Sequence, residues 1–314
     1  MWPEKLYRSA KTLRSLSLWP RLEPDLQNKV VKAMCKLTLM SPSNGKTSVQ
    51  LMGYRIRFPD KAMLKFLFDE IFVEAVYLFH SNTDHPTIID CGSNIGMSIL
   101  FFKSLYPNAR IIGFEPDPFT FKILSENIAL NGLSNVELHQ CALSHVDGPL
   151  PFYRPADLER STLQMNAIRP RQGNDKRITV DGRRLSHFIG EAEIDLLKLD
   201  IEGTEVNVLS EIAGADKLRN VKCIHFEYTL HTDANRDDLS FVLRLLEQNG
   251  FGYQLRTSAP AWPSERARQN ILFYCYRKHE LNSVTHDSSS ATRNHPNGEL
   301  LGSAPDLRQL DQRI

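Results

Sequence analysis

The sequence predicts an α/β protein built on a doubly wound, mostly parallel sheet. Short apolar segments of strand type alternate strictly with helical segments over residues 87–143, and the same alternation resumes over residues 194–276. Strands that alternate with helices along the chain pair in parallel through right-handed crossovers. The composition agrees, because 41% hydrophobic and 24% charged residues are typical of a globular protein.

Seven segments have the composition of sheet strands. Each is short, rich in Ile, Val, Leu or Phe, and bounded by residues that favour turns. The expected strands are residues 87–91, 110–114, 136–140, 194–199, 221–227, 251–256 and 271–276, and the expected helices between them are residues 97–106, 118–130, 203–212 and 237–249. Further expected elements are a strand or hairpin at residues 49–59, a helical segment at residues 62–79, and strand-like segments at residues 150–153 and 177–185.

The chain divides into three parts by composition. Residues 1–48 are expected to form an N-terminal helical cap, residues 49–280 the sheet domain, and residues 281–314 a disordered tail. The tail is dense in Ser, Asn, Asp, Gly and Pro, which cannot bury enough apolar surface to offset the entropy of ordering. Within residues 1–20, basic residues recur every third position beside apolar ones, which predicts an amphipathic helix. This helix covers the core in the favoured interpretation and makes peripheral contact with a membrane in the alternative.

Charge and composition exclude several classes of function. The chain has 38 Lys and Arg against 37 Asp and Glu, a net charge of +1, so nucleic acid is not an expected partner. No apolar run approaches the roughly 20 residues of a transmembrane helix, and the N-terminus lacks the apolar core of a secretory signal. The 5 cysteines lie far apart and form no Cys-x-x-Cys pair, so neither a zinc site nor a disulfide framework is expected. A cytoplasmic location fits these features best.

A glycine-rich turn after the first predicted strand marks a ligand site. Asp90, Gly92, Asn94 and Gly96 form the pattern Asp-x-Gly-x-Asn-x-Gly between a strand and a helix. Glycine at such a turn lets a ligand approach the backbone at the carboxyl edge of the sheet. A dinucleotide fingerprint would place glycines where Asn94 and Met97 stand, so an NAD-type oxidoreductase is the disfavoured alternative. The pattern matches the turn of S-adenosylmethionine enzymes, in which the acidic residue helps to hold the methionine moiety.

Glu115 follows the second predicted strand, about one β-α-β step after the turn. The two oxygens of a carboxylate at this position can accept both hydroxyls of a ribose. Each motif alone is weak, but the two stand in the register that a nucleoside-containing cofactor needs.

These motifs resemble the FkbM-type methyltransferase family. The resemblance covers residues 50–277 and rests on four segments: 88–96 (Ile-Ile-Asp-Cys-Gly-Ser-Asn-Ile-Gly), 113–117 (Gly-Phe-Glu-Pro-Asp), 131–136 (Asn-Gly-Leu-Ser-Asn-Val) and 196–205 (Leu-Leu-Lys-Leu-Asp-Ile-Glu-Gly-Thr-Glu). It implies a class I methyltransferase fold, which is Rossmann-like and has seven strands with the last one antiparallel. It also implies S-adenosylmethionine as methyl donor and O-methylation of a saccharide, a glycolipid or a polyketide-like natural product. On matching positions the implied cofactor-binding residues are Asp90, Gly92, Asn94 and Gly96 in the loop, Glu115 at the ribose, and residues 140–142, including Ala142, near the adenine.

The fourth of these segments supplies candidates for catalysis. Asp200 ends the fourth strand, beside the expected sulfonium, and is a candidate to orient the acceptor hydroxyl. Glu202 is a candidate ligand of the methionine amine, and Glu205 is expected to bond back to the start of the next helix as a structural cap.

Loss of the acceptor proton requires a base or a metal. His231, just past the fifth strand, is the candidate base, whereas His225 within that strand is expected to be a packed residue. Asp200 and Glu227, at neighbouring strand ends, are the candidate ligands in the competing Mg²⁺ mechanism, which is disfavoured because no third ligand is obvious. The expected partner is a small-molecule or glycan acceptor. A catalytically silent module that keeps the cofactor fold is the third class of function.

Overall fold

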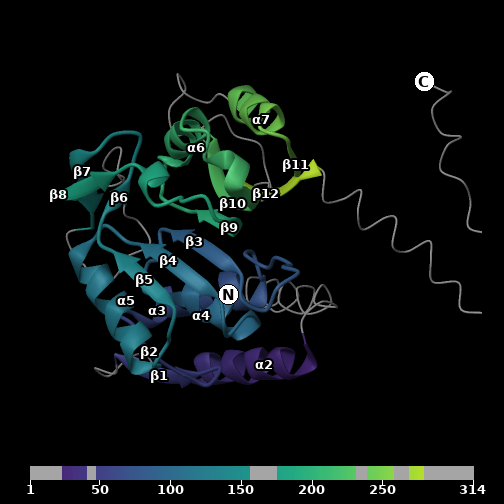
Figure 1. Ribbon diagram of the computed structural model, residues 1–314. Helices are drawn as coiled ribbons and strands as arrows, with labels where there is room; N and C mark the ends of the chain where they lie inside the picture. Colours follow the sequence, from purple (N-terminus) through teal and green to yellow (C-terminus); the bar gives the residue numbers. More distant parts are fainter. Residues whose placement is uncertain (1–22, 41–46, 156–174, 231–238, 258–268, 279–314) are drawn as a thin grey trace, which may run out of the picture. The chain divides into compact units, whose positions relative to one another are not determined.

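A seven-stranded sheet forms the centre of the fold (Figure 1). The computed structural model describes residues 23–40, 47–155, 175–230, 239–257 and 269–278. The sheet strands are β3 (Thr87–Cys91), β4 (Arg110–Phe114), β5 (Val136–His139), β9 (Ile194–Leu199), β10 (Val221–Leu230), β11 (Phe251–Thr257) and β12 (Gln269–Arg277). Each of the seven corresponds to an expected strand, so the predicted α/β class is confirmed.

The order of the strands is β11-β12-β10-β9-β3-β4-β5. Neighbours from β10 to β5 run parallel, whereas β12 is antiparallel to both β10 and β11. The chain therefore moves from β3 outward through β4 to β5 and then returns to build the other half from β9. The point between β3 and β9, where this order reverses, is where ligands bind in doubly wound sheets.

Helices cover both faces of the sheet because parallel strands are apolar on both sides. On one face lie α6 (Glu205–Gly214) and α7 (Leu239–Gln248), and on the other lie α3 (Lys61–Phe68), α4 (Met97–Leu105) and α5 (Pro118–Leu130) (Figure 1). Adjacent residues of β9 divide between the two cores, with Leu196 on the α4 side and Leu197 on the α6 side. The sheet is thus packed between two hydrophobic cores, one on each face, which hold its strand ends in place.

The N-terminal part packs on the α4 side. Helix α2 (Pro24–Leu39) buries Val30, Ala33 and Leu37 there, in keeping with a helical cap. Strands β1 (Ser48–Leu51) and β2 (Tyr54–Arg57) form the expected hairpin. The amphipathic helix expected within residues 1–20 and the tail at residues 281–314 lie outside the described residues, and the domain boundaries stay predictions.

The helix expected at residues 62–79 is wrong in its second half. Helix α3 ends at Phe68, and a π-helical turn, η1 (Asp69–Val73), follows it. Ala75 then adopts a φ of 49°, which a right-handed helix cannot continue through. The chain crosses the sheet in an irregular segment that carries Tyr77.

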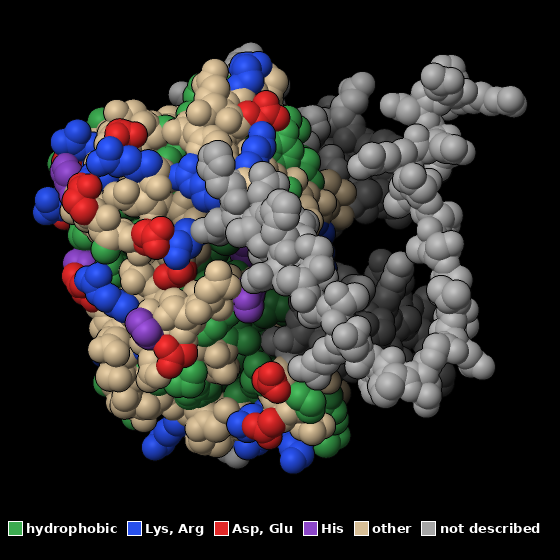
Figure 2. Space-filling view, turned by 45° about the vertical axis from the view of Figure 1, so that its right-hand side comes forward, with side chains coloured by type: hydrophobic (Ala, Val, Ile, Leu, Met, Phe, Trp, Pro, Cys, Tyr) green, Lys and Arg blue, Asp and Glu red, His purple; other side chains and the backbone are tan. Residues whose placement is uncertain are grey.

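A smaller sheet, in the order β6-β8-β7, joins the two strand-like segments at residues 150–153 and 177–185. Its strands are β6 (Ala142–Leu143), β7 (Gly148–Arg154) and β8 (Lys176–Arg183). Among the described helices, none is long and apolar enough to cross a membrane. On the face shown in Figure 2, basic and acidic side chains are interspersed, in keeping with the net charge of +1.

Candidate active site

The glycine turn after β3 is held against the ends of β4 and β9. The amides of Gly92 and Ser93 donate to the carbonyl oxygen of Phe114 at 3.0 and 2.8 Å, and the amide of Asp200 donates to the carbonyl of Cys91 at 3.1 Å. Gly92 has a φ of 83°, and a side-chain carbon there would lie 1.9 Å from the carbonyl oxygen of Asp200. No other residue fits this position, so the glycine at 92 is a requirement of the approach between β3 and β9.

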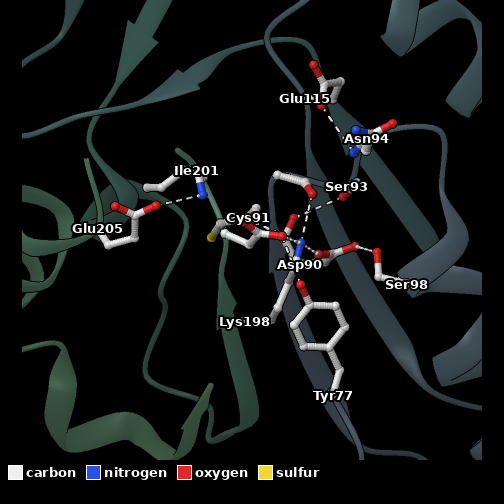
Figure 3. A network of polar contacts seen from close by, with 12 residues as sticks. Tyr77, Asp90, Cys91, Ser93, Asn94, Ser98, Glu115, Lys198, Ile201 and Glu205 are labelled. Carbon is white, nitrogen blue, oxygen red and sulfur yellow. Dashed lines mark hydrogen bonds and ion pairs between the residues drawn. The ribbon is translucent and has the colours of Figure 1, made fainter. Parts of the chain in front are cut away.

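Asp90 lies beneath this turn and is fully buried. Its Oδ2 accepts a hydrogen bond of 2.6 Å from the Ser98 hydroxyl, and its Oδ1 lies 3.1 Å from Nζ of Lys198 (Figure 3). Lys198 also donates to the carbonyl oxygen of Gly92 at 2.7 Å. Asp90 therefore supports the turn through an ion pair with Lys198 and a hydrogen bond from Ser98, and no described group donates a hydrogen bond to its Oδ1.

Lys198 is a functional candidate that the sequence analysis missed. Its side chain is 2% exposed, and its Nζ lies 3.8 Å from Oδ2 of Asp200 and 5.1 Å from the ring centre of Tyr77. Burial alone lowers the pKa of a lysine, but the carboxylates of Asp90 and Asp200 outweigh burial and raise the pKa of Lys198. The ammonium group thus stays charged and ties the ends of β3 and β9 together. A lysine inside the apolar strand Leu-Leu-Lys-Leu was the available signal.

Glu115 stands beside the turn, at the end of β4, and is 5% exposed. Its Oε2 accepts from the amide of Asn94 at 3.1 Å (Figure 3), and its Oε1 accepts from the amide of Asp117 at 3.0 Å. Burial outweighs these two amides and raises the pKa of Glu115 to about 8. Each oxygen keeps a second lone pair, so the carboxylate fits the two hydroxyls of a ribose.

Residues 140–142, which follow β5, were expected to lie near the adenine of the cofactor, and only two of the three line a pocket. Gln140 and Cys141 line an open pocket of about 300 Å³. Ala142 is instead buried in β6, in a small apolar cluster with Phe152 and Val180. Ala142 can therefore meet a ligand only through its main chain.

The loop between β9 and α6 is shaped by Glu205. Its Oε1 accepts from the amides of Ile201 and Gly203, and its Oε2 accepts from Gly203 at 2.9 Å. The predicted structural role of Glu205 is confirmed, and burial raises its pKa to about 7. Glu202, in the middle of this loop, has a φ of 57° and a partly buried side chain.

Asp200 faces the segment that follows η1. Its side chain is 30% exposed, and its Oδ2 accepts a hydrogen bond of 2.8 Å from the Tyr77 hydroxyl. Burial and the charge of Asp200 raise the pKa of Tyr77 well above its ordinary value, so Tyr77 remains a donor. Tyr77 and Asp200 are 123 residues apart in the chain, and no sequence spacing pointed to this contact.

Of the remaining catalytic candidates, Glu227 and His225 lie within the described residues and His231 does not. Glu227 lies on β10, close enough to Glu70 of η1 to raise the pKa of Glu70. His225 is 6% exposed, in keeping with the packed role expected for it, and burial lowers its pKa to about 4. His231 lies outside the described residues. Within the described part of the chain, no three His, Cys, Asp or Glu side chains are arranged to hold a metal ion.

Taken in chain order within the main sheet, the strands lie 3-2-1-4-5-7-6, with the seventh antiparallel. Together with a glycine turn after the first strand and acidic residues after the second and fourth, this defines a class I methyltransferase fold. The chain belongs to the FkbM methyltransferase family, because the family model, Methyltransferase FkbM domain, matches residues 90–253. It is thus a methyltransferase and not the NAD-type oxidoreductase of the alternative.

Named relatives cover most or about half of the chain. Methyltransferase 1 of Beauveria bassiana is 32% identical over 232 residues, which cover 68% of this chain and 90% of that protein. The 31-O-demethyl-FK506 methyltransferase FkbM of Streptomyces tacrolimicus is 32% identical over 184 residues, which cover 48% of this chain and 70% of that enzyme. The 2-O-methyltransferase NoeI of Sinorhizobium fredii is 31% identical over 158 residues, which cover 46% of this chain and 63% of that enzyme.

Solved structures with a detectable likeness include TYW2 of M. jannaschii in complex with AdoMet, with a TM-score of 0.38 and 13% identity over 75% of this chain and 88% of that one. Trm5b of Pyrococcus abyssi has a TM-score of 0.40 and 14% identity over 74% of this chain and 57% of that one.

Proposed function

We propose that this protein is an S-adenosylmethionine-dependent O-methyltransferase that acts on a hydroxyl of a saccharide, a glycolipid or a polyketide-like natural product. The observation that carries the proposal is the convergence of the glycine turn, the buried Glu115 carboxylate and Asp200 at the ends of three neighbouring strands. The names of two relatives, a 31-O-demethyl-FK506 methyltransferase and a 2-O-methyltransferase, support a hydroxyl acceptor.

The residues of the turn side would bind the cofactor. Gly92, Asn94 and Gly96 would offer the backbone of the loop, and Glu115 would take the ribose hydroxyls. Glu202 would take the methionine amine, and Ala142 would contact the adenine through its main chain. Bound in this way, S-adenosylmethionine supplies an electrophilic methyl group.

The residues of the Tyr77 side would bind the acceptor. Tyr77 holds Oδ2 of Asp200, and no described residue donates a hydrogen bond to the other oxygen, Oδ1, which would orient the acceptor hydroxyl. Aligning the two reactants and excluding water are the main ways in which an enzyme speeds an in-line displacement. Glu227 and His231 remain candidates for the same half of the site.

Titration calorimetry of the full chain with S-adenosylhomocysteine tests the cofactor. We expect one site per chain, with a dissociation constant well below the millimolar range. A folded sample that shows no heat at millimolar ligand would overturn the proposal.

Transfer of a labelled methyl group from S-adenosylmethionine to sugar and lipid extracts tests the reaction. We expect a labelled product that is stable to mild base, as an ether is and an ester is not. Binding without transfer to any extract would indicate the silent cofactor-binding module instead.

A further inference from the structure

Beside the cofactor turn, a polar layer lies between the sheet and the segment at residues 69–77. Lys198 and Tyr274 are the register partners of His225 in the two strands that flank β10. Register partners project from the same face of a sheet, and Glu227, two residues after His225, projects from that face as well. The rings of His225 and Tyr274 meet edge to face, 4.9 Å apart.

Glu70 contributes a carboxyl to this layer from the π-helical turn η1, which packs on the same face of the sheet. Burial and the charges of Asp200, Glu227 and Glu74 all act on the Glu70 carboxyl, and Lys198 acts in the opposite sense. Single π-helical turns are frequent at functional sites, because the extra residue changes which side chains a helix presents. The turn η1 thus brings the Glu70 carboxyl close enough to Asp200 for their charges to interact.

The acidic groups around Glu70 have distinct partners. Asp200 is held by Tyr77 and Lys198, and Glu74 pairs with Arg256 at 2.7 Å. The carboxyl of Glu70 receives no hydrogen bond from any residue that the structure describes. Glu70 therefore has no described hydrogen-bond donor on either carboxyl oxygen, whereas Asp200 has only Oδ1 left to meet a bound molecule.

His225 gives a second, independent sign that a polar ligand belongs here. Its side chain is 6% exposed, and its Nδ1 has no hydrogen-bond partner in the described part of the chain. A buried imidazole nitrogen without a partner costs free energy unless a ligand or a water satisfies it. Because His225 shares its sheet face with Lys198 and Glu227, this atom opens onto the same layer as Glu70.

We propose that Glu70 accepts the proton of the acceptor hydroxyl, while Asp200 positions that hydroxyl. The inference rests on the proposed function. In the step, the acceptor oxygen forms a bond to the methyl carbon as the carbon–sulfur bond breaks, and the electron pair of that bond stays on sulfur, which becomes a neutral thioether. The O–H proton passes to the Glu70 carboxylate and leaves to solvent afterwards.

The other groups of the layer suit this step less well. Burial lowers the pKa of His225 to about 4, which makes its nitrogen a weak proton acceptor. Tyr77 and Lys198 engage Oδ2 of Asp200, and both partners stabilise its charged form, so Asp200 holds a proton less readily and its Oδ1 is left to orient the hydroxyl. Burial, followed by the charges of Asp200 and Glu227, raises the pKa of Glu70 to about 8, close to the range in which a general base works best.

The test compares Glu70→Gln with Asp69→Asn, since Asp69 is the neighbouring carboxyl on the same turn and pairs on the surface with Lys65. With S-adenosylmethionine and an extract fraction that the native chain methylates, we expect Glu70→Gln to lower kcat roughly 10²- to 10⁴-fold and to leave the affinity for S-adenosylhomocysteine within twofold. Retained affinity shows that the variant is folded. Asp69→Asn should keep native turnover.

The pH profile separates a base from a structural role. In the native chain kcat should rise with pH up to about 8, and in Glu70→Gln the residual rate should lose this limb. Asp200→Asn should keep the limb while raising KM. Carbon-13 NMR of glutamate-labelled chain should show two side-chain carboxyls that titrate near pH 8, those of Glu70 and Glu115, and only the Glu70 signal should be absent from Glu70→Gln.

Three results would overturn the inference. If Glu70→Gln keeps native turnover, Glu70 takes no part in the reaction. If kcat falls in His231→Ala but not in Glu70→Gln, His231 is the group that accepts the proton. Activity that EDTA abolishes and Mg²⁺ restores would favour a metal. A native chain that binds no S-adenosylhomocysteine would instead overturn the proposed function, and this inference with it.

Discussion

Glu115 is the residue in which burial and hydrogen bonding compete most directly. Two backbone amides favour its charged form, and burial favours its neutral form and prevails. The two amides also fix the orientation of the carboxylate, which leaves its remaining lone pairs aimed in set directions. A ligand that brings two adjacent hydroxyls meets acceptors that need no rearrangement.

We therefore expect Glu115→Ala to weaken the binding of S-adenosylhomocysteine by about 1.5 to 3 kcal/mol, since two ribose hydroxyls lose their hydrogen-bond acceptors. Calorimetry measures the change. The control is Glu137→Ala on β5, because the Glu137 side chain is 53% exposed. Equal affinity in the two variants would remove Glu115 from the cofactor site.

At the scale of elements, the side chain of Asn127 connects helix α5 to the β1–β2 hairpin by hydrogen bonds. Asn127 is fully buried; its Oδ1 accepts from the amide of Arg57 at 2.7 Å, and its Nδ2 donates to the carbonyl oxygens of Arg57 at 3.0 Å and Ile95 at 2.8 Å. One side chain thus connects β2, α5 and the cofactor turn. Asn131, one turn later on the exposed surface, repeats the pairing with both backbone groups of Arg55.

Replacement of Asn127 by Ala should lower the free energy of unfolding by about 2 to 4 kcal/mol, because three backbone groups in buried or part-buried hydrogen bonds lose their partner. Asn131→Ala should cost less than about 1.5 kcal/mol, because water replaces the lost bonds. Urea unfolding of both variants measures the difference. An equal decrease in the free energy of unfolding in both variants would contradict this connecting role of Asn127.

The sequence was sufficient to predict the seven sheet strands, because fully buried parallel strands are apolar runs with turn residues at both ends. It failed at η1, where a π-helical turn and a positive φ at Ala75 depend on tertiary packing. The cofactor turn was predictable because its residues are contiguous. The layer of Glu70, Tyr77 and Lys198 was not, because its members come from distant segments that meet only in the folded sheet.

For the whole molecule, the buried carboxyls of three glutamates make the stability of the fold depend on pH in the same direction. Burial raises the pKa of Glu70 and Glu115 to about 8 and that of Glu205 to about 7, from about 4.5 in an exposed chain. The folded chain therefore binds more protons than the unfolded chain over this range, and these groups contribute stability that is lost as pH rises through their folded pKa values. His225 acts in the opposite sense, but only between its folded pKa of about 4 and its ordinary value of 6.5.

As pH rises from 6.5 to 9, the urea concentration at the unfolding midpoint of the unliganded chain should therefore decrease. The decrease should be smaller in Glu70→Gln. Parallel curves for the native chain and Glu70→Gln would show that Glu70 ionises in the folded state as it does in the unfolded one.

The position of β12 bears on how the chain is made. Among the described strands β12 is the last to leave the ribosome, yet it lies inside the sheet, between β10 and β11. Until residue 277 has emerged, the edge of β10 is unpaired and β11 has no neighbour in the order that the finished sheet shows. An open edge of this kind can pair with other chains. Completion of the sheet consequently follows synthesis of the last strand, and a nascent chain stalled before β12 would expose the backbone donors and acceptors of the β10 edge.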